Sequence, residues 1–385
     1  MALESLQSKR VLLFIAVGLV AFVLYLYFYV GTINFIDVVE HANLFYYSSA
    51  FGAFIAATLF SALTWKSLLR NLNIKTTIRR TLLLTWAGYF FDATLPEPGW
   101  SGDLSKAYLL SKKSGQDMGR IVASVVSQKI IGMVVTVVGL ALGLGLLATE
   151  YTLPALVLVF LGGVLFVTVA ALVVVYYVSR RPKVTQKMLN WLIRLISFIL
   201  RSHWDAVAFR NSAESSLRMF HEGIESLSSD KKALIRPVLL YTVSIVFDVS
   251  LVFFVFAALG SVVPVDTILI VYALTGTIQS IGMSFVGFTE IIMSTSYTVL
   301  GIQPALSFSV TLLTRVVTLW FKLVVAYFAF QWASLGILLG KKKKDAVPAG
   351  SEGDLPSVPV YRLEKHFNAD ASTLLWEYTC LQRLC

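Results

Sequence analysis

Long apolar segments constrain the fold of this chain more than any other feature. Runs of roughly 20 apolar residues are each long enough to cross the ~30 Å hydrocarbon core of a bilayer as a helix. They are Val11–Val30, Leu44–Leu63, Ile121–Ala148, Leu153–Val178, Pro237–Gly260 and Ala305–Leu339. Because 57% of the 385 residues are hydrophobic and only 14% are charged, the chain is too apolar for a soluble protein. We therefore expect an all-α, multi-pass membrane protein with about six full spans.

Two further apolar runs, Thr81–Leu110 and Thr267–Leu300, are interrupted by proline and glycine. The first contains the segment LPEPGWSGDLSKAYLL at Leu95–Leu110. Backbone groups freed by such breaks cannot face lipid, so they must be buried in protein or line a wet cavity. We predict two re-entrant helical hairpins, with structural breaks at Pro96, Pro98, Gly99, Gly102, Gly282 and Gly287.

Lysine and arginine cluster in three connections, which the positive-inside rule assigns to the cytoplasm. The clusters are Lys66–Arg80, Arg180–Arg201 and Lys341–Lys344. This assignment is consistent only if each broken run enters and leaves the membrane on the same side. The first run would do so from the cytoplasm and the second from outside. We therefore expect an inverted repeat with both termini cytoplasmic, in the cell (plasma) membrane.

The expected domain organisation follows from these spans. Residues 1–340 form the transmembrane domain, with a first repeat region at 44–178 and a second at 237–339. Residues 179–236 connect them as amphipathic helix at the cytoplasmic membrane surface, because apolar residues alternate there with arginine and lysine. Residues 341–385 form a cytoplasmic tail, which is either disordered or foreign to the natural chain. We interpret Val11–Val30 as a retained span, since no small-residue cleavage site follows it.

Charged residues within the apolar runs are the candidate functional residues. A charge at a helix centre costs ~2.5–3.5 kcal/mol on insertion scales, so it usually faces a partner or water. Each half carries an acid at its break and a base in the next span, namely Asp103 with Lys129 and Glu290 with Arg315. Arg315 and Lys322 are seven residues apart, so they share one face of a regular helix. Lys322 could equally extend to the lipid head groups.

Asp248 also lies within an apolar run. The sequence leaves two roles open for it, an ion or proton relay and a structural counter-charge for one of the cations.

Other chemistries lack support in the sequence. The four histidines are scattered singly, and the two cysteines, Cys380 and Cys385, have no metal-ligand spacing, so we expect no metal or other cofactor. Phosphate-loop, nucleophile-elbow and dinucleotide motifs are absent. The net charge of +10 arises from residues between the apolar runs, which favours topology signals and anionic lipid over nucleic acid as partner.

The segment at Leu95–Leu110 resembles a signature of the flippase-like transmembrane region of lysylphosphatidylglycerol synthases, the multiple peptide resistance factors, and their stand-alone relatives. That signature reads Leu-Pro-x-x-x-Gly-(Glu/Asp)-x-x-(Arg/Lys)-Ala-x-Leu-Leu, and this chain is two residues longer. Gly102 and Asp103 match the Gly-acid pair and Lys106 the basic position. In the second half, Gly287-Phe288-Thr289-Glu290 resembles the Gly-x-x-Glu of the family, Gly301 its following glycine, and Arg315 its arginine.

This sequence departs from the family pattern mainly in the first half of the chain. Ser127–Gly132 lies where the family has Glu-Arg-x-x-Asp, so Lys129 replaces an arginine while Gln128 and Gly132 replace acids. Lysine lacks the bidentate fork of arginine, which weakens a planar grip on phosphate or carboxylate. Ser284-Phe285-Val286 also lacks the Pro-Gly-Gly usual before the second break. About 45 residues follow the last span, too few for the synthase domain that performs aminoacyl transfer in the full-length relatives.

The resemblance implies an integral membrane protein that moves a polar-headed lipid, such as an anionic or modified phospholipid or a lipid-linked intermediate, between leaflets. The predicted substrate-binding residues are Asp103, Lys106, Lys129, Glu290 and Arg315. Two alternatives remain open, a membrane-embedded transferase acting on a lipid-linked substrate and an ion-coupled small-solute transporter. The expected partners are membrane lipids, with a lipid-synthesising or glycosyltransferase enzyme and a second copy of the chain as further candidates. A scaffold for such an enzyme is a weaker alternative.

Overall fold

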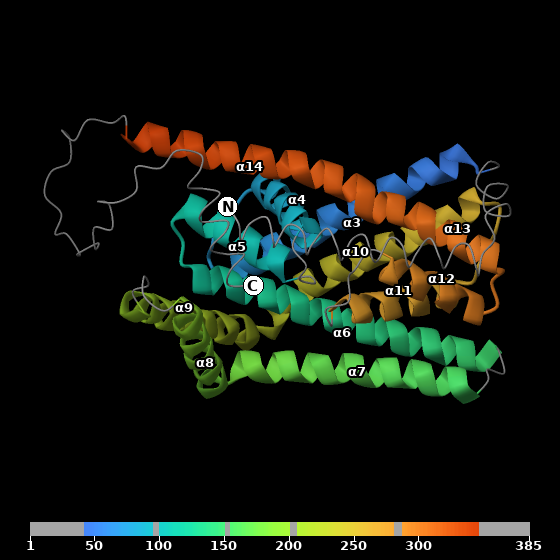
Figure 1. Ribbon diagram of the computed structural model, residues 1–385, viewed down its shortest axis with the longest axis horizontal. Helices are drawn as coiled ribbons and strands as arrows, with labels where there is room; N and C mark the ends of the chain where they lie inside the picture. Colours follow the sequence, from blue (N-terminus) through green and yellow to red (C-terminus); the bar gives the residue numbers. More distant parts are fainter. Residues whose placement is uncertain (1–41, 95–99, 151–154, 201–205, 281–286, 346–385) are drawn as a thin grey trace, which may run out of the picture.

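The computed structural model describes residues 42–94, 100–150, 155–200, 206–280 and 287–345. Every regular element in these ranges is a helix, which confirms the predicted all-α class (Figure 1). The helices are α3 (Leu44–Asn71), α4 (Ile78–Thr94), α5 (Ser101–Ser114), α6 (Met118–Glu150), α7 (Ala155–Arg180), α8 (Pro182–Leu200), α9 (Ala206–Ser229), α10 (Lys231–Ala258), α11 (Val265–Ser280), α12 (Phe288–Val299), α13 (Pro304–Arg315), the π-helix η2 (Val316–Phe321) and α14 (Lys322–Asp345).

Helical segments long and apolar enough to cross a membrane occur at five of the predicted spans. They lie in α3, α6, α7, α10 and the continuous segment α13–η2–α14. The remaining predicted span, Val11–Val30, lies outside the described residues. The chain is thus a multi-pass membrane protein, with more than one segment able to span the bilayer in each predicted half.

Helices α3 and α10 form the antiparallel pair at the centre of the fold (Figure 1). At one end of the pair, the Asn43 backbone N–H donates to the Ala258 carbonyl at 2.7 Å. At the other end, the Asn71 side chain donates to the Ala233 carbonyl at 3.0 Å. The start of each helix therefore lies beside the end of the other, and small residues such as Ala50, Ala53 and Ala57 on α3 permit their close packing.

Both interrupted runs form pairs of short helices, as predicted. The first run gives α4 and α5, and the second gives α11 and α12. At 1.5 Å per residue, the 14 residues of α5 extend about 21 Å, less than the ~30 Å hydrocarbon core of a bilayer. Neither α5 nor the 12-residue α12 is long enough to cross alone.

The two hairpins enter the fold from opposite ends. Leu69 near the end of α3 and Leu110 near the end of α5 belong to one buried cluster, so α4 leaves from that end and α5 returns to it. At the other end, Phe256 near the end of α10 packs edge-on against Tyr297 of α12, with ring centroids 5.2 Å apart. Because α3 and α10 are antiparallel, the hairpins are inverted relative to each other.

The helices that cover the two hairpins are related by the same inversion as the hairpins themselves. Helix α4 of the first hairpin lies against α14, where Phe90 stacks on Phe330 at 4.9 Å. Helix α11 of the second hairpin lies against α6, where Ile270 and Ala273 pack with Leu140. Each hairpin therefore packs against the long span of the opposite half, which joins the halves into one core.

Gly102 differs from the prediction that it forms part of the first break. It lies in the first turn of α5 and approaches Gly88 of α4 closely. A Cβ atom at Gly88 would lie 2.8 Å from the Gly102 carbonyl oxygen. Glycine is required there because the two hairpin helices touch through their backbones. Gly287 is placed as predicted, as the N-cap of α12 with a φ of 92°.

The segment after Arg315 also differs from the prediction. Val316–Phe321 forms a π-helix, whose i→i+5 bonds give a wider turn than an α-helix. Arg315 contacts Glu290 of α12, whereas Lys322 lies over the Tyr89 ring of α4. The two cations therefore contact different helices, and the face shared in a regular helix is lost.

The connection between the halves comprises α8 and α9. Helix α8 crosses the direction of α7 at its end, and α9 lies along the first part of α6 (Figure 1). Phe220 and Ile224 of α9 pack against Ala123 and Val126 of α6. The predicted amphipathic character agrees with a strongly one-sided distribution of apolar residues on both helices.

The Gly88 contact leads to a test of the hairpin. We expect Gly88→Ala to destabilise the protein by about 1–3 kcal/mol, because the methyl group must push α5 away from α4. Thermal unfolding in detergent measures the effect. The control is Gly52→Ala on α3, where an added Cβ meets no atom within 4 Å and helix propensity favours alanine. Equal stability of the two variants would contradict the close approach.

Candidate functional site

A cavity of about 190 Å³ lies beside the first hairpin, among α3, α4, α5, α6 and α10. Polar and charged side chains contribute about half of its wall, although most of these helices are apolar. The lining residues are Ser61, Thr85, Gly88, Tyr89, Asp92, Gly102, Asp103, Lys106, Val125, Gln128, Lys129 and Tyr241. Three of the predicted site residues, Asp103, Lys106 and Lys129, are thus brought together at one cavity.

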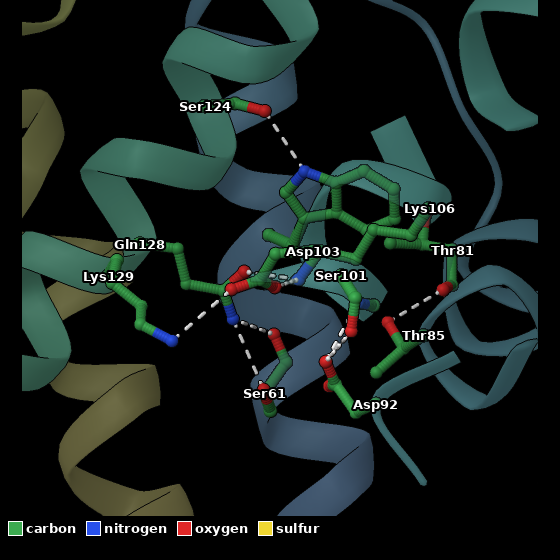
Figure 2. A network of polar contacts seen from close by, with 12 residues as sticks. Ser61, Thr81, Thr85, Asp92, Ser101, Asp103, Lys106, Ser124, Gln128 and Lys129 are labelled. Atoms are coloured by element: carbon green, nitrogen blue, oxygen red, sulfur yellow. Dashed lines mark hydrogen bonds and ion pairs between the residues drawn. The ribbon is translucent and has the colours of Figure 1, made fainter. Parts of the chain in front are cut away.

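Asp103 bridges the two lysines (Figure 2). One carboxylate oxygen lies 2.6 Å from Lys106 Nζ, and the other lies 3.6 Å from Lys129 Nζ. Asp103 is in the first turn of α5, where the helix dipole favours a negative charge. Lys106 follows it by one turn on the same face, and Lys129 comes from α6. The arrangement is a two-cation site with an internal carboxylate between the cations.

Each lysine is also held against a tryptophan. Lys106 Nζ lies 5.0 Å from the centre of the Trp65 ring, and Lys129 Nζ lies 5.2 Å from that of Trp100. Such contacts stabilise an ammonium group in a partly desolvated place. The Trp65 ring is fixed in turn by its indole N–H, which donates to Ser124 Oγ at 2.9 Å.

Gln128 holds Lys106 from the other side. Its Oε1 accepts from Lys106 Nζ at 3.3 Å, and its Nε2 donates to the Ser61 carbonyl and hydroxyl oxygens, each at 3.1 Å. The side chain thus connects α6 with α3 across the cavity. Gln128 stands where the family pattern has an acid, and its amide replaces that charge with a bridge of hydrogen bonds.

Asp92 is a cavity residue that the sequence analysis missed. Its Oδ1 accepts from the Gly102 backbone N–H at 2.7 Å and from Ser101 Oγ at 3.1 Å (Figure 2). Asp92 of α4 therefore caps the start of α5 across the break and satisfies the Gly102 N–H, one of the four N–H groups that lack a partner within a helix. The available signal was an aspartate in an otherwise apolar run, four residues before Pro96.

Gly132, another departure from the family pattern, accommodates Tyr241 of α10. A Cβ atom at Gly132 would lie 2.6 Å from the Tyr241 hydroxyl oxygen, which faces the cavity. The acid usual at this position is thus replaced by space for a phenol from the second half of the chain.

A simpler pair joins the second hairpin to the next helix, α13. Arg315 Nε donates to Glu290 Oε1 at 2.6 Å, and the side chains are 11% and 5% exposed. The other Glu290 oxygen accepts from the Gly287 backbone N–H at 2.7 Å. Glu290 is the third residue of α12, just as Asp103 is the third of α5. The predicted pairing of Glu290 with Arg315 agrees with this geometry.

Asp248 and Lys322 lie apart from both pairs. Tyr272 donates its hydroxyl to Asp248 Oδ2 at 3.1 Å, and in the part of the chain that the structure describes no lysine or arginine nitrogen lies within 4 Å of Asp248. Lys322 Nζ lies 5.3 Å from the centre of the ring of Tyr89, a residue that lines the cavity. Asp248 thus has a phenol as its direct partner, and Lys322 is the cation whose charge acts on it from a longer distance.

The remaining predicted breaks, Pro96, Pro98, Gly99 and Gly282, lie outside the described residues. Within the described ranges, no three histidine, cysteine or acidic side chains are grouped so that they could hold a metal ion. The cavity presents two ammonium groups, those of Lys106 and Lys129, on either side of the Asp103 carboxylate.

Together the fold and the site define a polytopic helical membrane protein with two inverted broken hairpins, each with an acid that pairs with a base of the following span. The chain belongs to the lysylphosphatidylglycerol synthase TM region family, whose model matches residues 13–326.

Archaeal relatives share most of its length. It is 22% identical to a UPF0104 membrane protein of Pyrococcus horikoshii, over 88% of this chain and 98% of the relative. It is also 22% identical to a UPF0104 membrane protein of Methanocaldococcus jannaschii, over 80% and 90%. The resemblance inferred from the hairpin motifs is thereby confirmed at the level of the family.

The buried pair of the second hairpin leads to a test. We expect Arg315→Ala to lower stability by about 3–5 kcal/mol, because Glu290 would remain buried without its cation. Adding Glu290→Gln should restore much of the loss, since the buried charge is then removed. Denaturant unfolding of the single and double variants measures both effects. Strictly additive losses would argue against a coupled pair. As a control, Arg210→Ala on exposed α9 should cost under about 1 kcal/mol.

Proposed function

We propose that this protein moves a polar-headed lipid, such as an anionic or modified phospholipid or a lipid-linked intermediate, from one leaflet to the other. The observation that carries the proposal is the coincidence of helix breaks, paired charges and a polar cavity within the apolar core. Intramembrane charges are costly and usually serve a substrate or ion path. Broken helices in an inverted repeat are a recurrent way to build such a path.

In this proposal the head group enters the cavity of the first hairpin. Its anionic group binds Lys106 and Lys129 and replaces the Asp103 carboxylate between them. The start of α5 faces the same place and adds its partial positive charge. When the head group leaves, Asp103 returns to the lysines, so no cation remains without a partner. The acyl chains stay in the bilayer meanwhile.

The second hairpin supplies the corresponding site for the opposite leaflet. There Arg315 receives the anionic group and Glu290 pairs with Arg315 when the site is empty. Because the hairpins enter from opposite ends, the two sites would serve opposite sides of the membrane. The Arg315–Glu290 contact is short and buried, whereas Asp103 and Lys129 are about one-fifth exposed, so the described arrangement favours entry at the first hairpin.

The end of the fold at which α3 and α5 terminate carries Lys66, Arg70, Lys112 and Lys113, and we assign it to the cytoplasm of a cell (plasma) membrane. The head group would then be accepted from the cytoplasmic leaflet. An anionic head group made in the cytoplasm is the substrate that this orientation suits best.

The test is leaflet exchange in proteoliposomes with head-group-labelled lipids. We expect Lys129→Ala and Arg315→Ala each to reduce the exchange rate at least tenfold, because each removes a cation that receives the head group (about 1.4 kcal/mol per tenfold). The matched control is Arg210→Ala, which removes an exposed cation on α9.

Folding of each variant is checked by size-exclusion chromatography and thermal unfolding. The proposal fails if Asp103→Ala, Glu290→Ala and Arg315→Ala are all folded and exchange lipid at the rate of the unmodified protein. A transferase would instead show product formation that each carboxylate variant abolishes. A solute transporter would show uptake that depends on an ion gradient and on Asp248.

A further inference from the structure

Helix α8 carries a basic stripe formed by Lys183, Lys187 and Arg194. These residues are four and seven positions apart, so they lie on one helix face, and all three are exposed. The sequence of α8 contains no aspartate or glutamate. In the ranges that the structure describes, no acidic oxygen lies within the 4 Å ion-pair distance of any of the three.

The cations of the neighbouring helix α9, in contrast, form ion pairs. Arg210 pairs with Glu214 at 2.8 Å, and Arg218 pairs with Glu222 at 3.4 Å, both along α9 itself. The two helices are consecutive and pack against each other at the same end of the molecule (Figure 1). The arginines of α9 are thus paired within the helix, while the three cations of α8 are exposed and available to an anionic partner.

Exposed apolar side chains accompany the stripe. Met188 and Trp191 of α8 are 55% and 63% exposed, and the helix crosses the direction of the spans where α7 ends (Figure 1). A helix at this level, with a basic face and an adjacent tryptophan, has the character of helices that lie in the membrane interface.

The orientation of α8 is fixed by the protein. Thr185 Oγ1 and His221 Nε2 of α9 share a hydrogen bond of 2.7 Å. Burial lowers the pKa of His221, so the ring is neutral near pH 7 and the contact adds no charge. The basic stripe is therefore presented in one orientation before any partner binds.

We propose that α8 is a binding surface for the anionic head groups of lipids in the leaflet at its end of the protein. The apolar side chains enter the acyl region, and the three cations contact lipid phosphates. The basic edge continues to Arg180 at the end of α7 and Arg181 in the connection to α8, which lie over the rings of Tyr176 and Tyr177. A soluble acidic protein is a poorer occupant, because it would leave Met188 and Trp191 without an apolar partner. This surface is separate from the cavity, so the inference stands independently of the proposed function.

The test uses the full chain in phosphatidylcholine nanodiscs with and without phosphatidylglycerol. We expect phosphatidylglycerol to raise the thermal midpoint of the unmodified protein, and high salt to diminish this shift through screening. The variant Lys183→Gln/Lys187→Gln/Arg194→Gln should lose roughly a hundredfold in phosphatidylglycerol affinity, at about fivefold per cation. Its midpoint in pure phosphatidylcholine should be unchanged, which shows that it is folded.

The matched control is Arg210→Gln/Arg218→Gln, which removes two cations that are already paired and should keep the shift.

A second measurement reports whether α8 lies in the membrane. A fluorophore is attached to the cysteine of a Trp191→Cys variant in which Cys380 and Cys385 are changed to serine. Quenching by brominated lipid is expected. The proposal is overturned if the triple variant keeps the phosphatidylglycerol shift. It is also overturned if the fluorophore is not quenched while the triple variant loses a co-purifying protein, which would identify a protein-docking face.

Discussion

The structure depends on one electrostatic constraint, that a charge within the hydrocarbon region needs a counter-charge or water. Asp103 meets it by bridging Lys106 and Lys129, and Glu290 meets it with Arg315. Asp92 provides the same compensation for the backbone, because its carboxylate accepts from the Gly102 N–H at the start of α5. The broken helices are thus compatible with a membrane only because side chains of neighbouring elements complete them.

The central pair of α3 and α10 explains how two such breaks coexist in one core. The antiparallel packing of these helices sends the hairpins in from opposite ends. Each hairpin is then covered by the long span of the other half, α4 by α14 and α11 by α6. Neither half could bury its own broken element alone, so the two halves require each other for folding.

Much of this architecture could be predicted from the sequence. Apolar run length located the five spans of the described residues, and proline and glycine located the hairpins. The charge pairs followed from their matched positions, because an acid at each break needs a base nearby.

The details that could not be predicted depend on tertiary contacts. Gly102 packs against Gly88 instead of forming the break, since the helix begins just before it. Asp92 and Gln128 act across helices that are distant in sequence, and no local periodicity reports such a contact. The π-helix at Val316–Phe321 likewise has no signal in hydrophobic spacing.

That π-helix has a mechanical consequence. Arg315 lies immediately before it and Lys322 immediately after it, so its six residues set the angle between two cations that contact α12 and α4 respectively. Rewinding these residues into an α-helix would rotate one cation about the helix axis relative to the other. One span would then act as a torsional coupling between the two hairpins, without any need for the span to move along the membrane normal.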